Sequence, residues 1–157
     1  MRIIVCSVAD IKSKAAQFEN FFDDEKFFIT IKSSSEIDWA VEVYDPIRVL
    51  QLTFDDEPYD ETEQQVRVFG KNHARAIKRF VDNLNPKKTL YINCTNGNTR
   101  SAAVGMIINQ YINEFLINNQ NDSDFFKKIN RNLTPDKSVQ DLLSVEFFGD
   151  FTVEDNQ

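Results

Sequence analysis

A cysteine and an arginine with five residues between them are the residues of this chain best suited to chemistry. The two residues begin and end the run Cys94-Thr95-Asn96-Gly97-Asn98-Thr99-Arg100, and Ser101 follows this run. Thiolates form at helix N-termini and beside arginine, so Cys94 is a candidate nucleophile. The planar fork of Arg100 can hold two oxygens of a phosphate. The run therefore combines a nucleophile with a clamp for a phosphate group.

The elements expected on either side of this run make it a candidate anion-binding loop. Residues 89–93 predict a buried strand, and residues 101–118 predict a helix. The free N–H groups and the dipole at a helix start favour an anion, and successive loop N–H groups can converge on one. The backbone of residues 95–100 is therefore the predicted phosphate cradle. The alternative is that Cys94 is a buried, inert cysteine at a strand end.

These residues carry a family resemblance. Cys94, five intervening residues, Arg100 and Ser101 are similar to the cysteine-x5-arginine-serine motif of the protein tyrosine phosphatase superfamily, and Gly97 matches its usual loop glycine. The small chain resembles the dual-specificity and the bacterial or phage tyrosine phosphatase-like branches. The resemblance implies that phosphate monoesters are hydrolysed through a phosphocysteine on Cys94, with Ser101 supporting the thiolate as it leaves. It implies no cofactor and no metal.

An acid must also protonate the leaving oxygen from the side opposite the nucleophile. In the resembled family this acid is an aspartate on a loop that follows a strand. Residues 48–54 predict such a strand, and an acidic segment follows it. By position after the strand, Asp56 is the first candidate, Asp55 the second and Asp60 the third. The alternative is a solvated acidic loop with no catalytic part.

The chain departs from the family pattern at Asn93, where the family usually has a histidine that orders the loop and activates the thiol. Asparagine has no titrating ring, so we expect slower turnover or a higher pH optimum. The uncharged Asn96 and Asn98 weigh against a polyphosphorylated substrate. His73 is the only histidine. It lies on the apolar side of a helix predicted over 62–84, and we expect it to be packed and hydrogen-bonded rather than catalytic.

Composition limits the class of protein and its partners. The chain has 157 residues, of which 41% are hydrophobic, and this suits one domain with a core. The net charge of -7 weighs against nucleic acid as a partner and against docking on an anionic membrane. Two cysteines are too few for a disulfide framework. No apolar stretch approaches the roughly 20 residues of a membrane span, and no signal peptide is visible, so we expect a cytoplasmic protein.

Strands and helices alternate along the chain. Strands are predicted over 2–8, 27–31, 48–54 and 89–93, and helices over about 10–21, 62–84, 101–118, 124–130 and from 135 onwards. This order predicts an α/β fold with a central, mainly parallel sheet of four to five strands flanked by helices. Such sheets bind ligands at the carboxyl ends of their strands, where the Cys94 loop and the acidic loop should meet. We expect a single domain over 1–149 and a short acidic tail over 150–157.

The expected function is hydrolysis of phosphate monoesters, with a phosphorylated protein as the partner and phosphotyrosine as the first substrate class. Dual specificity and oligomeric state stay open. One alternative is a weak or inactive pseudophosphatase that binds phosphorylated partners, supported by Asn93 and the uncertain acid. A second is an RNA 5′-phosphatase, which would need a local basic face from one of two groups, Arg75, Lys78 and Arg79 or Lys127 and Lys128.

Overall fold

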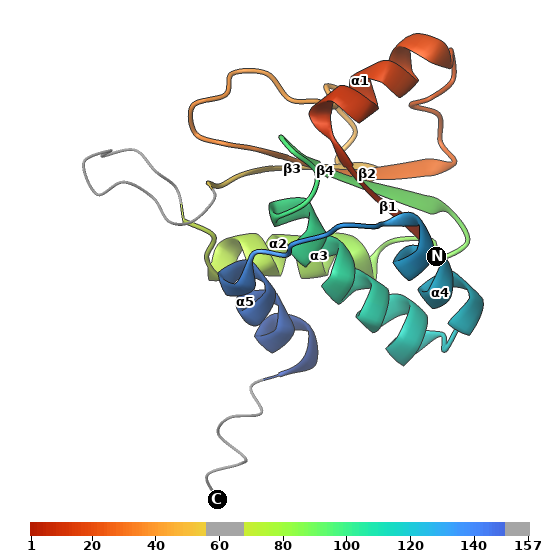
Figure 1. Ribbon diagram of the computed structural model, residues 1–157, viewed down its shortest axis with the longest axis vertical. Helices are drawn as coiled ribbons and strands as arrows, with labels where there is room; N and C mark the ends of the chain where they lie inside the picture. Colours follow the sequence, from red (N-terminus) through yellow and green to blue (C-terminus); the bar gives the residue numbers. More distant parts are fainter. Residues whose placement is uncertain (56–67, 150–157) are drawn as a thin grey trace, which may run out of the picture.

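The computed structural model describes residues 1–55 and 68–149, which are coloured in Figure 1. Strands of this part of the chain form a four-stranded sheet in the order β1-β4-β2-β3, and each of its pairings is parallel. The elements are β1 (Arg2–Ser7), α1 (Val8–Gln17), β2 (Lys26–Lys32), β3 (Val49–Thr53), α2 (Lys71–Asp82), β4 (Thr89–Cys94), α3 (Arg100–Ile108), the π-helix η1 (Asn109–Leu116), α4 (Gln120–Ile129) and α5 (Lys137–Phe148). The predicted α/β fold class is confirmed.

Helices cover both faces of the sheet. Figure 1 shows α1 on one face and α2, α3 and α5 on the other. The larger core joins the sheet to α2, α3 and α5 through residues such as Ile77 and Leu143. The smaller core lies on the α1 face and is rich in aromatic rings, with Phe21 packing edge-on against Phe28 and Tyr91. Each face of the sheet therefore has an apolar layer of its own.

β4 lies between β1 and β2, and its side chains point into both cores of the protein. Ile92 and Cys94 belong to the larger core, and Tyr91 belongs to the smaller one. Because side chains alternate along a strand, Asn93 shares the face of Tyr91. Cys94 pairs in register with Ser7, the last residue of β1. The end of β4 thus lies at the carboxyl edge of the sheet, where ligands bind in folds of this class.

Helix boundaries differ from the predicted ones where the chain turns early. α1 ends at Gln17 because Phe18 is extended, and Phe21 turns into the smaller core. Of the helix predicted over 62–84, residues 68–70 are not helical, and α2 begins at Lys71 with Gly70 as its N-cap. The helix predicted over 101–118 changes after Ile108 into η1 and ends at Leu116. Hydrophobic periodicity does not reveal such a change of helical pitch.

Polar caps set the starts of the last two helices. α4 begins at Gln120, earlier than predicted, because the Asn119 side chain accepts a hydrogen bond from the Asp122 N–H at 3.1 Å. α5 begins after Asp136, whose carboxylate accepts from the Ser138 N–H at 3.1 Å. In residues 1–55 and 68–149, no helix has both the length and the apolar character needed to cross a membrane. The tail predicted over 150–157 lies outside the described residues.

Candidate active site

The Cys94 side chain lies at the junction of β4 and the loop over 95–99. Its exposed fraction is 0%. The sulfur is 3.0 Å from the Ser101 hydroxyl oxygen and accepts a hydrogen bond from the Gly97 N–H at 3.3 Å. The structure therefore brings together the predicted nucleophile, the loop backbone and the predicted supporting hydroxyl.

Position 97 of the loop can accommodate only glycine, for two structural reasons. Its φ is +75°, a region that residues with a side chain rarely adopt. A Cβ at this position would lie 2.4 Å from the carbonyl carbon of Cys6 and 2.5 Å from the backbone nitrogen of Ser7. The loop is thus packed directly on the end of β1. Both the backbone conformation and this close approach require glycine.

The linker between α4 and α5 fixes the orientation of the loop peptides. The Asn98 carbonyl accepts a hydrogen bond from the Thr134 N–H at 2.8 Å, and the Thr99 carbonyl accepts from the Asp136 N–H at 3.1 Å. In a trans peptide the N–H points away from the carbonyl before it. The N–H groups of Thr99 and Arg100 therefore point away from this linker. Sequence reasoning missed the linker, because nothing in its residue types places it beside the loop.

The Arg100 guanidinium is held from two sides. Its exposed fraction is 3%. Nη1 donates to the carbonyl of Phe54 at 2.9 Å, and Nη2 donates to the Thr95 hydroxyl at 3.1 Å. A cation at a helix start is opposed by the helix dipole, and these acceptors offset that cost. The predicted clamp is therefore fixed at the start of α3 between the end of β3 and the loop.

Glu36 is a residue of the site that the sequence did not indicate. Its Oε1 accepts from the Thr95 hydroxyl at 2.7 Å and from the N–H and hydroxyl of Ser33 at 3.1 and 2.9 Å. Burial opposes ionisation of Glu36, but the hydrogen bonds from Thr95 and Ser33 and the charge of Arg100 together hold its pKa below the ordinary value. No motif links Glu36 to Thr95, which is 59 positions away.

Of the three candidate acids, the structure describes Asp55 alone. Its Oδ1 accepts from the Ser34 N–H at 2.8 Å, and its Oδ2 accepts from the Ser34 hydroxyl at 2.6 Å. Asp55 thus ties the end of β3 to the turn after β2. Asp56 and Asp60 lie outside the described residues. Phe54, which follows β3 directly, accepts a hydrogen bond from Arg100 through its carbonyl, so the end of β3 lies next to the Cys94 loop.

Asn93 does not face the Cys94 sulfur. It is 1% exposed and lies on the opposite face of β4 from Cys94. Its register neighbours are Cys6 on β1 and Thr30 on β2. Among the described residues, the Asn93 Nδ2 and the Thr30 Oγ1 have no hydrogen-bond partner. Asn93 therefore belongs to the α1 face of the sheet rather than to the sulfur site.

His73 is packed and hydrogen-bonded, as predicted. Its Nδ1 accepts from the Gly70 N–H at 3.0 Å, and its Nε2 is 3.0 Å from the Thr53 carbonyl. Since the Nδ1 atom is an acceptor, the Nε2 atom carries the proton and donates to Thr53. The ring also stacks on Phe69 at a centroid distance of 5.4 Å. His73 thus joins the start of α2 to the end of β3.

Cys6, the second cysteine, lies in a different core from Cys94. It belongs to the smaller core, whereas Cys94 belongs to the larger one. Burial, with a smaller contribution from Asp10, raises the pKa of the Cys6 thiol to about 12. Cys6 is therefore a protonated, structural thiol at neutral pH.

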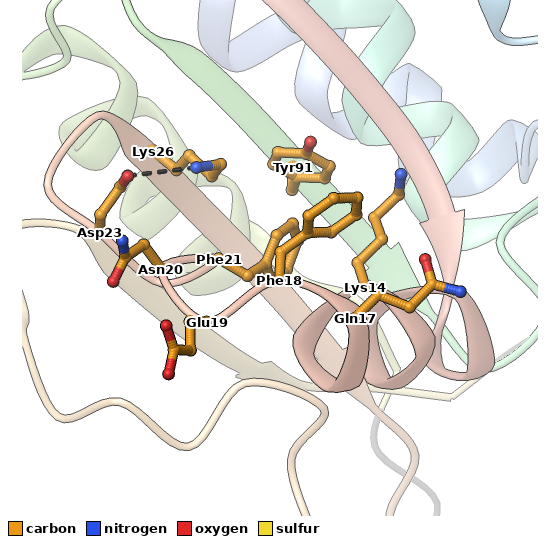
Figure 2. Close-up of a pocket in the computed structure, with 9 residues that line it drawn as sticks. All are labelled: Lys14, Gln17, Phe18, Glu19, Asn20, Phe21, Asp23, Lys26 and Tyr91. Carbon is orange, nitrogen blue, oxygen red and sulfur yellow. Dashed lines mark hydrogen bonds and ion pairs between the residues drawn. The ribbon is translucent and has the colours of Figure 1, made fainter.

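A separate pocket of about 490 Å³ opens on the α1 face. Figure 2 shows its lining, with the rings of Phe18, Phe21 and Tyr91 beside the Lys26–Asp23 ion pair. It lies between the end of α1 and the start of β2, and no residue of the Cys94 loop lines it. The pocket is therefore distinct from the predicted phosphate site.

The basic groups required by the RNA alternative are partly neutralised. Lys78 pairs with Asp82 at 2.6 Å, and Lys127 pairs with Glu114 at 3.3 Å. An exposed cation that is already paired with a carboxylate attracts a nucleic-acid backbone less strongly. These pairs weigh against that alternative.

No family model, curated protein or solved structure matches the chain.

Proposed function

We propose that the chain is a cysteine-dependent phosphatase that hydrolyses phosphate monoesters, with protein phosphotyrosine as the first substrate class. The observation that carries this proposal is the surroundings of the Cys94 sulfur. It accepts from a loop N–H at 3.3 Å and lies 3.0 Å from the Ser101 hydroxyl. The guanidinium of Arg100 is fixed at the other end of the same loop. The nucleophile, the anion-binding backbone and the clamp thus lie on one loop.

In the first step the Cys94 thiolate attacks phosphorus, and the bond between phosphorus and the ester oxygen breaks. The loop N–H groups and the Arg100 fork hold the three non-bridging oxygens, over which the charge spreads in the transition state. The leaving oxygen keeps the electron pair and takes a proton from a carboxylic acid. Asp56 stays the first candidate for this acid, because both carboxylate oxygens of Asp55 accept from Ser34. Asp60 follows it.

In the second step water attacks the phosphocysteine, and the sulfur leaves as a thiolate. The ionised acid takes the proton of the water. The hydroxyl of Ser101, 3.0 Å from the sulfur, is placed to donate to the departing thiolate. Inorganic phosphate is then released and the Cys94 thiolate is regenerated, so the reaction consumes only the ester and water.

One observation favours a second candidate, a protein that binds phosphorylated partners without turnover. The exposed fraction of Cys94 is 0% and that of Arg100 is 3%. A substrate reaches the sulfur only if the residues that cover it move. A chain whose loop stays closed would still bind phosphate at the more exposed N–H groups of residues 95–99.

The test is hydrolysis of para-nitrophenyl phosphate between pH 4 and 8 in the presence of a chelator. We expect turnover by the wild type, none by Cys94→Ser, and a loss of about 10²–10³-fold in kcat for Arg100→Lys, which keeps the charge and loses the fork. Cys6→Ala and Arg75→Lys are matched controls, because Cys6 lies in the other core and Arg75 is exposed on α2. Both should keep wild-type kcat.

A wild type that binds inorganic phosphate through Arg100 but turns nothing over would overturn the phosphatase and establish the second candidate. Absence of both turnover and binding would overturn both. Activity that survives in Cys94→Ser would contradict the proposed nucleophile.

A further inference from the structure

We propose that Glu36 is a positioning residue that orients the Arg100 guanidinium through the hydroxyl of Thr95. The three side chains form one hydrogen-bonded chain. Thr95 donates to Glu36 Oε1 at 2.7 Å, and Arg100 Nη2 donates to Thr95 at 3.1 Å. A threonine hydroxyl has a single proton. Because this proton points to Glu36, a lone pair of the same oxygen faces Arg100.

The turn after β2 holds the carboxylate of Glu36 rigidly. Ser33 donates its N–H and its hydroxyl to the same Oε1 at 3.1 and 2.9 Å. The neighbouring Ser34 is tied to Asp55 at the end of β3 by two hydrogen bonds. The turn therefore bridges β3 and the phosphate loop. An acceptor fixed in this way can set the direction of the Thr95 hydroxyl.

The charge of Glu36 excludes the other role that a carboxyl group could have here. The hydrogen bonds and the nearby guanidinium hold the pKa of Glu36 below its ordinary value, in spite of burial. The group is therefore ionised at neutral pH and is unsuited to donating a proton to a leaving oxygen. Its effect on the reaction is transmitted through Thr95.

Two effects of Glu36 on a bound anion have opposite signs. Its negative charge repels phosphate, which weakens binding. Its hydrogen bond orients the fork of Arg100, which strengthens binding and, where the site turns over, stabilises the transition state. Glu36→Gln removes the charge and keeps an acceptor for Thr95. Glu36→Ala removes both, so the difference between these two variants isolates the positioning effect.

The experiment compares these variants in two backgrounds. In the wild-type background we expect Glu36→Ala to bind inorganic phosphate about tenfold more weakly than Glu36→Gln, as for one lost hydrogen bond to a charged group. A similar ratio should appear in kcat. In a Thr95→Val background, where the link is absent, the two variants should be equal. A role confined to holding the Ser33 turn would leave the difference unchanged.

The positioning role of Glu36 rests on the proposed phosphate site, but its failure can be distinguished from failure of the proposed phosphatase activity. Turnover with equal phosphate affinities for Glu36→Gln and Glu36→Ala would overturn the positioning role and leave the phosphatase standing. Phosphate binding without turnover, with the tenfold difference present, would support the positioning role while the phosphatase fails. If Glu36→Ala does not fold, Thr95→Val against Thr95→Ser gives the same comparison, and equal affinities there would overturn the inference.

Discussion

The Ser101 hydroxyl and the Cys94 sulfur lie 3.0 Å apart, and both residues are 0% exposed. A hydrogen bond between buried groups is stronger than the same bond in water. Its importance grows when the sulfur becomes a full thiolate. In the proposed mechanism this happens in the free enzyme and again as the phosphocysteine breaks down. In the first step the thiolate is the starting state, whereas in the second step it is the leaving group. Stabilising the thiolate lowers the barrier of the second step only, so Ser101 should affect that step more.

We expect Ser101→Ala to lower kcat by about ten- to a hundredfold, the loss of one hydrogen bond to a charged group. Phosphocysteine should accumulate, because its breakdown becomes rate-limiting. A rapid-quench or stopped-flow assay with para-nitrophenyl phosphate should show a burst of one product per site. Ser101→Thr keeps the hydroxyl and is the matched control. Wild-type kcat without a burst in the alanine variant would contradict this role.

The ionised Glu36 gives the fold a pH dependence of known sign. Its folded pKa is lowered from the reference value of 4.5. A lowered pKa stabilises the folded state above the unfolded pKa, and this stability is lost as the pH falls through the folded pKa. We expect the free energy of unfolding of the wild type to exceed that of Glu36→Gln at pH 7, with a smaller difference at pH 3. Urea unfolding at the two pH values measures it, and a difference that grows toward pH 3 would contradict it.

At the scale of elements, the contact between the Cys94 loop and the end of β1 is the closest approach that a glycine makes in the described chain. The Cβ positions of Gly70 and Gly149 have no atom within 4 Å, whereas that of Gly97 meets the backbone of Cys6 at 2.4 Å. Gly149 shares a positive φ with Gly97. Substitutions at these three glycines can therefore distinguish the cost of backbone strain from the cost of steric overlap.

We expect Gly97→Ala to lower the free energy of unfolding by about 3 kcal/mol or more, because strain and overlap with backbone add. Gly149→Ala carries strain without overlap and should cost about 1 kcal/mol. Gly70→Ala carries neither and should change stability by less than about 1 kcal/mol. Urea unfolding of the three variants gives the ranking. Equal costs at positions 97 and 149 would show that the loop moves off β1.

At the scale of the whole molecule, segments far apart in the sequence hold the Cys94 loop. β1 packs on Gly97, the turn after β2 reaches Thr95, and the carbonyl of Phe54, the residue after β3, accepts from Arg100. The linker before α5 binds the loop carbonyls from the other side. The site is therefore a product of the complete strand order, and it depends on the central position of β4.

Local patterns predicted the parts of the site that are local in the chain. The apolar run before Cys94 indicated a strand, and the Cys94–Arg100 spacing placed a thiol and a guanidinium at the two ends of one loop, as the structure has them. Glu36 and Thr134 could not be predicted, because turns of ordinary polar residues bring them there and no periodicity records the contact. The early end of α1 could not be predicted either, since burial of Phe21 in tertiary packing overrides its helical pattern.

The separation of Cys6 and Cys94 into cores on opposite faces of the sheet has a consequence for redox chemistry. The chain has two cysteines, and a disulfide needs side chains that point toward each other. Cys6, with its pKa near 12, also supplies almost no thiolate. A sulfenic acid on Cys94 therefore has no second thiol of its own chain to trap it before further oxidation. Recovery of the Cys94 thiol then depends on an external reductant. Intact mass measured after peroxide treatment, with and without glutathione, follows this recovery.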